Sequence, residues 1–222
     1  MNPHLFVSDL SKVHLPNVFN PYVDVCAAHD CSDAPNRRRK NLEAMICGAI
    51  ESKVDTIWVA RDLGYRGGRR TGIALTDEPH LEEMSRLYSG IHLEKATIGP
   101  QVSERTASVI WNVISRISQP VFLWNVFPFH PHEADKPFSN RSHTKSERKL
   151  ALPFLHTLIA LLGARRLIAV GKDAESALRN IGLPVSVVRH PSYGGQTEFL
   201  CGIESLYKLP DCSAHTLPLL EN

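Results

Sequence analysis

The stretch Thr56-Ile57-Trp58-Val59-Ala60 is an apolar run that leads directly into Arg61 and Asp62. Three later apolar runs also end in polar or glycine-rich residues: 121–124 before Asn125, 167–170 before Gly171, and 185–188 before Arg189 and His190. Buried strands of a parallel sheet read as continuous apolar runs, and ligands of open α/β sheets bind beyond the carboxyl ends of the strands. The sequence therefore predicts a site where Asp62, Asn125 and His190 meet at one edge of a sheet.

Segments with helical character separate the four runs. Helical spacing or helix-boundary residues mark them at 37–52, 80–89, 103–117, 144–162, 173–181 and 196–207. Thr144 and Glu147 have the spacing of a capping box, Gly163 is a typical helix stop, and Ser103 is a candidate N-cap. Alternating strands and helices predict an α/β protein, a three-layer αβα sandwich around a mainly parallel four-stranded sheet.

Residues 1–222 are expected to form a single domain, because 222 residues with 43% hydrophobic content can bury a sizeable core. Residues 1–36 are rich in Pro, Asn, Asp and Ser and show little periodicity, so we expect an irregular lead segment there. The tail at 209–222 is expected to be loose.

Composition narrows the class of protein further. No apolar stretch is long enough to cross a bilayer, and the N-terminus lacks the regions of a signal peptide. The five cysteines include no CxxC pair, which suits reduced thiols better than disulfides, zinc or an iron–sulfur cluster. We therefore expect a monomeric protein of the cytoplasm, without membrane contact. The net charge of +2 identifies no partner.

The loop after Asp62 combines glycines with arginines. Glycines let the backbone approach a ligand closely and present N–H groups to an anion, and arginines add positive charge. The loop lacks the spacing of a P-loop or a Rossmann fingerprint, and a flexible surface turn is the simpler reading. Its candidate phosphate contacts are Arg66, Gly67, Gly68, Arg69 and Arg70. The cluster Arg37-Arg38-Arg39-Lys40 is either a second nucleic-acid phosphate contact or an exposed helix start.

Polar residues after the later strands add further candidates. The amide of Asn125 offers both a donor and an acceptor, as recognition of a nucleobase edge requires, although an asparagine also commonly fixes a turn. His190 precedes Pro191 and Ser192, and a strand-end histidine can donate to negative charge that develops on a leaving group. The roles of His130, His132 and His143 stay open, and no metal is expected because supporting ligands at metal spacing are missing.

Taken in order, these motifs resemble the uracil-DNA glycosylase superfamily over about residues 50–207. Ala60-Arg61-Asp62-Leu63-Gly64, followed by 69–76, resembles the first motif of the family, and His190-Pro191-Ser192 resembles the second. Leu123-Trp124-Asn125 is similar to the strand whose final Asn reads the base.

The resemblance implies a DNA glycosylase that everts a nucleotide from DNA and hydrolyses its N-glycosidic bond without a cofactor. Asp62 would activate water and stabilise the sugar cation, and His190, in its neutral form, would stabilise the departing base anion. Asn125 would select the base edge, and the loop 64–70 and Ser192 would contact duplex or single-stranded DNA.

Three departures from the family pattern bear on substrate choice. Gly64 stands where the best-known branch has a Tyr that bars substituents at the pyrimidine C5 position, and Leu75 stands where a stacking Phe is usual. Gly194 stands near the usual wedge leucine, so Tyr193 or Gln196 is expected to fill the gap. The pocket is therefore expected to be roomy and to take a deaminated base or a 5-substituted pyrimidine as well as uracil. Such an enzyme would act in DNA repair or in defence against phage with modified DNA.

Two other functions remain compatible with these residues. One is a non-hydrolytic reader of unusual bases or single-stranded DNA, which would have no need of an acid at position 62. The other is a hydrolase of free nucleosides, whose activity would depend little on salt.

Overall fold

The computed structural model describes residues 2–210, and its centre is a parallel four-stranded sheet. The strands lie in the order β3-β2-β5-β6. Their bounds are Thr56–Asp62 for β2, Phe122–Phe127 for β3, Arg166–Val170 for β5 and Val185–Val188 for β6. All three pairings are parallel, and Ala60 of β2 lies opposite Asn125 of β3. The carboxyl ends of the four strands therefore meet at one edge.

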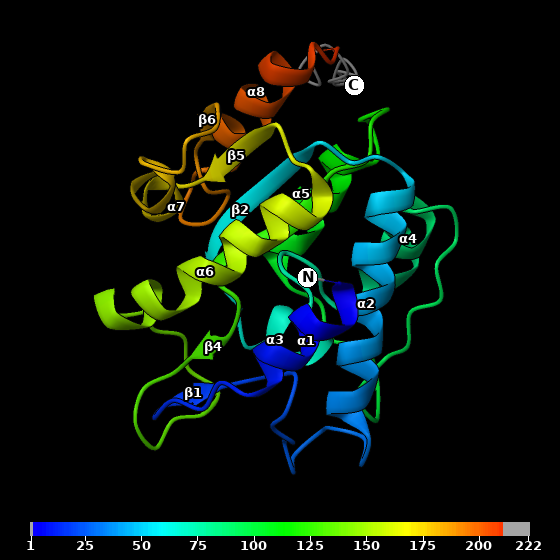
Figure 1. Ribbon diagram of the computed structural model, residues 1–222, viewed down its shortest axis with the longest axis vertical. Helices are drawn as coiled ribbons and strands as arrows, with labels where there is room; N and C mark the ends of the chain where they lie inside the picture. The colour runs from blue at the N-terminus through cyan, green and yellow to red at the C-terminus, as the bar shows by residue number, and fades with distance from the viewer. Residues whose placement is uncertain (1, 211–222) are drawn as a thin grey trace, which may run out of the picture.

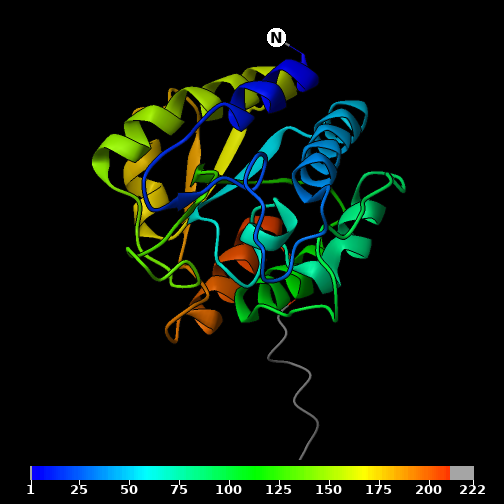
Figure 2. The ribbon, with the colours of Figure 1, turned by 90° about the horizontal axis from the view of Figure 1, so that it is seen from below.

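Helices cover both faces of this sheet (Figures 1 and 2). One face carries α1 (Pro3–Ser11), α2 (Ala34–Glu51) and α6 (Lys145–Leu162). The other carries α5 (Arg105–Ile114) and α8 (Gln196–Tyr207). Four shorter helices complete the described chain: α3 (Gly68–Thr71), the 3-10 helix η1 (Glu78–His80), α4 (Leu81–Leu87) and α7 (Lys172–Leu178). The predicted three-layer sandwich is confirmed.

Local chemistry explains where α6 begins and ends. Thr144 accepts from the backbone N–H of Glu147, and the Glu147 carboxylate accepts from the backbone N–H of Thr144, which completes the predicted capping box of α6. The helix ends at Gly163, whose φ of 61° is a left-handed conformation that favours glycine. Both boundary predictions are confirmed.

The sheet is anchored to α8 through a buried aromatic group. Trp58 is fully buried, packs edge-on against Phe199 and donates its indole N–H to the Tyr207 hydroxyl at 2.9 Å. Side chains alternate across a strand, so Ala60 and Asp62 share the sheet face of Trp58. The face that carries α5 and α8 is therefore the face on which the candidate residues of β2 lie.

Two sequence-based expectations about local structure are wrong. The lead segment is not irregular throughout, because it contains α1. Asn2 caps this helix, and the helix buries Phe6, Val7 and Leu10 in the core. Glu104, not Ser103, is the N-cap residue of α5, and it makes no side-chain capping bond. Most of the predicted loose tail lies outside the described residues.

A small second sheet joins the lead segment to the loop after β3. Its strands β1 (Val18–Phe19) and β4 (His130–Pro131) pair antiparallel. No helix within residues 2–210 is long and apolar enough to span a membrane.

Candidate active site

A cavity of about 340 Å³ opens at the carboxyl ends of β2, β5 and β6. Its lining includes Asp62, Gly64, Leu75, Glu104, His190 and Ser192. Asp62 and His190, which are far apart in the sequence, thus line the same cavity. The predicted convergence is present for Asp62 and His190, but Asn125, the third predicted member of the site, does not line this cavity.

Asp62 is the last residue of β2, and its carboxylate is almost fully buried. The Arg61 guanidinium donates its Nε–H to Oδ2 at 2.7 Å, and His143 Nδ1 contacts Oδ1. A carboxylate oxygen has a second lone pair, so these two contacts fix the orientation of Asp62 while leaving it able to accept a proton from water.

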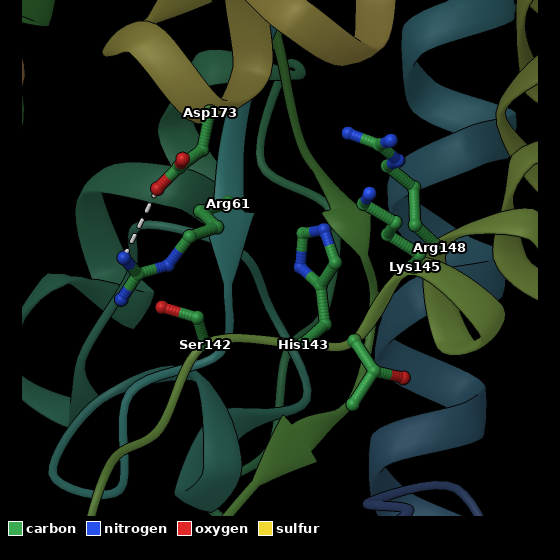
Figure 3. A pocket seen from close by; sticks show the side chains of 7 residues that line it. Arg61, Ser142, His143, Lys145, Arg148 and Asp173 are labelled. Atoms are coloured by element: carbon green, nitrogen blue, oxygen red, sulfur yellow. Dashed lines mark hydrogen bonds and ion pairs between the residues drawn. The ribbon is translucent and has the colours of Figure 1, made fainter.

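His143 is a functional candidate whose role the sequence left open. It lies in the loop before α6 and lines a second, smaller pocket of about 110 Å³ (Figure 3). In Figure 3 its ring lies between Arg61 on one side and Lys145 and Arg148 on the other. This second pocket shares Arg61 and Asp173 with the main cavity, so a basic surface adjoins the Asp62 carboxylate.

His190 follows β6, and its environment keeps the imidazole neutral. Burial, reinforced by the nearby positive charges of Arg61 and Arg189, lowers the His190 pKa to about 4. The backbone N–H of Ser192 donates to Nδ1 at 3.2 Å, and the Ser192 hydroxyl lies 2.8 Å from the same nitrogen. Because Nδ1 accepts, the neutral ring carries its proton on Nε2, where it can donate to an anion.

This assignment predicts how His190 titrates. Because its pKa in the folded protein lies below the ordinary value, the ring stays neutral above about pH 4 and takes up a proton only below that. Nitrogen-15 NMR of the folded protein should show the Nε2–H tautomer at pH 7. A titration midpoint near pH 6.5 for this ring would contradict the assignment.

Asn125 is placed differently from the other two candidates. It is 1% exposed, and neither amide atom has a hydrogen-bond partner within residues 2–210. It does not line the main cavity itself, but it lies opposite Ala60, which does. A buried amide without hydrogen-bond partners lowers the free energy of unfolding, so Asn125 destabilises the fold.

Replacing Asn125 with leucine is expected to raise stability and lower function together. An apolar side chain removes the buried unpartnered amide, which should raise the free energy of unfolding by about 1 kcal/mol in denaturant titrations. If the amide reads a base, the same variant should release that base at least about tenfold more slowly. A variant that is less stable but fully active would contradict both expectations.

The space beside Gly64 is not empty. A Cβ atom built on Gly64 would lie 2.3 Å from Oε1 of Glu104, and one built on Gly67 would lie 2.1 Å from Oε2. The carboxyl group of Glu104 therefore fills the volume that side chains at both positions would need. A polar carboxyl group therefore stands beside Gly64, where the sequence predicted only open space.

Two of the expected phosphate-binding arginines are buried. Arg69 is 3% exposed, lies over the Phe19 ring at 3.7 Å and donates to His130 Nδ1 at 3.0 Å. Arg70 is 7% exposed and forms an ion pair with Glu78 at 3.2 Å. The expectation that these side chains hold DNA phosphates is therefore wrong, because both face the interior of the protein. Arg66 is exposed, and Gly67 and Gly68 are buried.

The cluster at the start of α2 is also tied into the protein. Arg38 is fully buried and pairs with Asp30, Arg37 pairs with Asp33, and Arg39 donates to a backbone carbonyl. Of the two readings of this cluster, the structure supports the helix start, but Arg38 is buried and not exposed as expected.

The remaining histidines do not form a metal centre. Within the part of the chain that the structure describes, no group of three or more His, Cys, Asp or Glu side chains is arranged to hold a metal ion. His130 is buried beside Arg69, and burial lowers its pKa to about 3. His132 stacks on the His130 ring, and its Nδ1 lies 2.9 Å from the backbone carbonyl of Glu133.

The turn after His190 presents its side chains outward. Tyr193 is 98% exposed and has a φ of 50°, a left-handed conformation that is uncommon for a residue with a side chain. Gln196 is exposed at the first turn of α8, while Ser192 is partly buried beside His190. An exposed aromatic ring thus stands at the mouth of the cavity that contains Asp62.

The site thus combines an acid at the end of β2 with a histidine turn after β6, both at the carboxyl edge of a parallel sheet. Comparison with known protein families agrees with this arrangement. The family model of the uracil DNA glycosylase superfamily matches residues 61–208 of the chain. The chain belongs to this superfamily, whose membership supports a DNA glycosylase type of function.

Solved structures give the same fold. The crystal structure of Pedobacter heparinus SMUG2 superposes with a TM-score of 0.61 at 14% sequence identity, covering 94% of this chain and 97% of that one. No curated protein matches the chain significantly.

Proposed function

We propose that this protein is a DNA glycosylase that removes a damaged or modified base from DNA by hydrolysing its N-glycosidic bond. The observation that carries the proposal is the shared cavity of Asp62 and His190, two side chains from opposite ends of the matched region. One is a carboxylate and the other a neutral hydrogen-bond donor, which are the two groups that hydrolysis of this bond uses.

The proposed reaction proceeds at an everted nucleotide. The bond between C1′ and the base nitrogen breaks, its electron pair leaves with the base, and the sugar becomes an oxocarbenium ion. The Asp62 carboxylate stabilises this cation and accepts a proton from the water that adds to C1′. The Nε2–H of His190 donates to the departing base anion, which takes up a proton from solvent. The products are a free base and an abasic site.

The outward side chains support a proposal for DNA binding. Tyr193 at the cavity mouth is suited to enter the space that an everted base leaves, with Gln196 and Ser192 contacting the backbone around it. Arg66, Lys145 and Arg148 take the phosphate-binding role that the buried arginines cannot. Lys145 and Arg148 form no ion pair within residues 2–210 and border the pocket that adjoins Asp62.

This phosphate role predicts a change in salt dependence. The double variant Lys145→Ala/Arg148→Ala should bind duplex DNA more weakly, and its log K against log salt slope should be shallower by about two. Fluorescence anisotropy at several salt concentrations measures both quantities. An unchanged slope would show that Lys145 and Arg148 do not contact DNA phosphates.

The substrate we propose is uracil, another deaminated base or a 5-substituted pyrimidine, and the setting is repair or defence against phage with modified DNA in the cytoplasm. The test is a panel of single- and double-stranded oligonucleotides, each with one such base, in which alkali-labile breaks and released base are measured. Tight binding with no release from any member would indicate a reader of unusual bases. Equal rates on free nucleosides would indicate a nucleoside hydrolase.

A further inference from the structure

We propose that Glu104 is a specificity-determining residue that selects a base carrying an O–H or N–H donor on the edge turned toward Gly64. The inference rests on the proposed function and deepens it. It starts from the contact between this side chain and the two loop glycines, which places a hydrogen-bonding group in the wall of the cavity that holds Asp62 and His190.

The backbone of Glu104 is held firmly while its carboxyl group is left free. The backbone N–H donates to Asp77 Oδ2 at 2.6 Å, and the backbone carbonyl accepts from the N–H of Ser108 at 3.1 Å as the first turn of α5 forms. No hydrogen bond within residues 2–210 ends on the carboxyl oxygens of Glu104. The carboxyl group is therefore positioned against the loop by its backbone, with its hydrogen-bonding capacity unused.

The loop has no side chain in the way of this group. A Cβ atom at position 64 or 67 would displace the Glu104 carboxyl group from its present place, because it would overlap the carboxyl oxygens. Glycine at both positions lets the carboxyl group reach the cavity wall, where a bound base would meet it. A base with a donor at that edge pairs with Glu104, and a base with a methyl group there leaves the carboxyl group desolvated and unpartnered.

The surroundings of Glu104 bring the protonation of its carboxyl group close to neutral pH. Burial, together with the negative charge of Asp77, raises the Glu104 pKa to about 7, and the positive charge of Arg66 opposes that rise. Asp77 in turn contacts His80, while Asp62 and His190 line the same cavity as Glu104. Above about pH 7 the group is a carboxylate that only accepts, and below it the protonated acid also donates. Preference for a donor-bearing base should therefore rise between pH 6 and pH 8.

The experiment compares matched bases that differ by one donor. Oligonucleotides carry 5-hydroxymethyluracil or thymine, 5-hydroxymethylcytosine or 5-methylcytosine, and single-turnover rates are measured with wild type, Glu104→Gln and Glu104→Ala. The control Glu51→Gln removes an exposed charge at the end of α2, outside the cavity. Thermal unfolding of each variant shows whether it is folded, and the rates are repeated at pH 6 and pH 8.

The wild type is expected to prefer the donor-bearing member of each pair, about tenfold or more. Glu104→Ala should lose that preference, whereas Glu104→Gln should keep part of it because an amide oxygen still accepts, with no change between pH 6 and pH 8. A ratio that is unchanged in Glu104→Ala, or equal slowing on both members of a pair, would overturn the inference and leave the proposed function intact. Release of no base at all by the wild type would overturn the proposed function instead.

Discussion

Replacing Asp62 with asparagine is expected to slow base release by a factor of about 10²–10⁴, the usual contribution of a positioned acid–base group. An amide of the same shape can still meet Arg61 and His143, but it has no negative charge for the sugar cation and takes no proton from water. The single-turnover rate at saturating enzyme measures the effect on the chemical step alone.

The matched control for this loss is Asp9→Asn. Asp9 is an exposed carboxylate of α1, paired with Lys12, and it lies outside the cavity. It should change the rate by less than about twofold, since surface charges of this kind contribute little. If Asp62→Asn is folded, binds DNA as the wild type does and releases the base at the wild-type rate, Asp62 has no role in the chemical step.

Replacing His190 with alanine is expected to cost a factor of about 10²–10³ in the same rate. The neutral Nε2–H is a preorganised donor in a buried site, and removal of one such donor typically has this effect. The loss should be smaller for a base that is a better leaving group, because its anion needs less stabilisation. A series of uracils with different N1 acidities measures this dependence.

The variant Ser192→Ala distinguishes the role of the His190 imidazole from that of the Ser192 hydroxyl beside it. The hydroxyl is lost, but the backbone N–H of residue 192 still donates to Nδ1 and keeps the proton on Nε2. Its single-turnover rate should fall by less than about tenfold, in line with one lost hydrogen bond. If Ser192→Ala were as slow as His190→Ala, the hydroxyl and not the imidazole would be the important group.

Elements with a local cause were predictable from the sequence. The bounds of α8 agree with the predicted range 196–207, and the limits of α6 follow from Thr144, Glu147 and Gly163. Each depends on residues within a few positions of one another. The parallel direction of the strands and the meeting of Asp62 with His190 followed from the general behaviour of α/β sheets, whereas the strand order was not predicted.

What the sequence did not predict depends on partners distant in the chain. Arg69 and Arg70 look exposed beside glycines, yet Phe19, His130 and Glu78 bury them. Likewise, nothing near Gly64 in the sequence indicates the carboxyl group of Glu104, the N-cap residue of α5. These contacts form only once the sheet has assembled, so spacing within one segment carries no signal of them.

Two further features that we did not predict, α1 and the contact of His143 with Asp62, differ in how far the sequence indicates them. Asn2 before Pro3 is a typical start of a helix, and Phe6, Val7 and Leu10 have helical spacing, so α1 could have been recognised. His143 directly precedes the capping box of α6 and so lies at a fixed helix start. Its contact with Asp62, however, depends on the packing of the loop.

The most direct test of the whole account is a crystal structure with duplex DNA that contains a 2′-fluoro nucleotide of the preferred base, whose glycosidic bond resists cleavage. The account predicts that the base lies everted in the cavity, with C1′ beside the Asp62 carboxylate, a base oxygen within hydrogen-bond distance of His190 Nε2, and Tyr193 in the vacated stack. A base that stays stacked in the duplex, or one bound on another face of the protein, would contradict it.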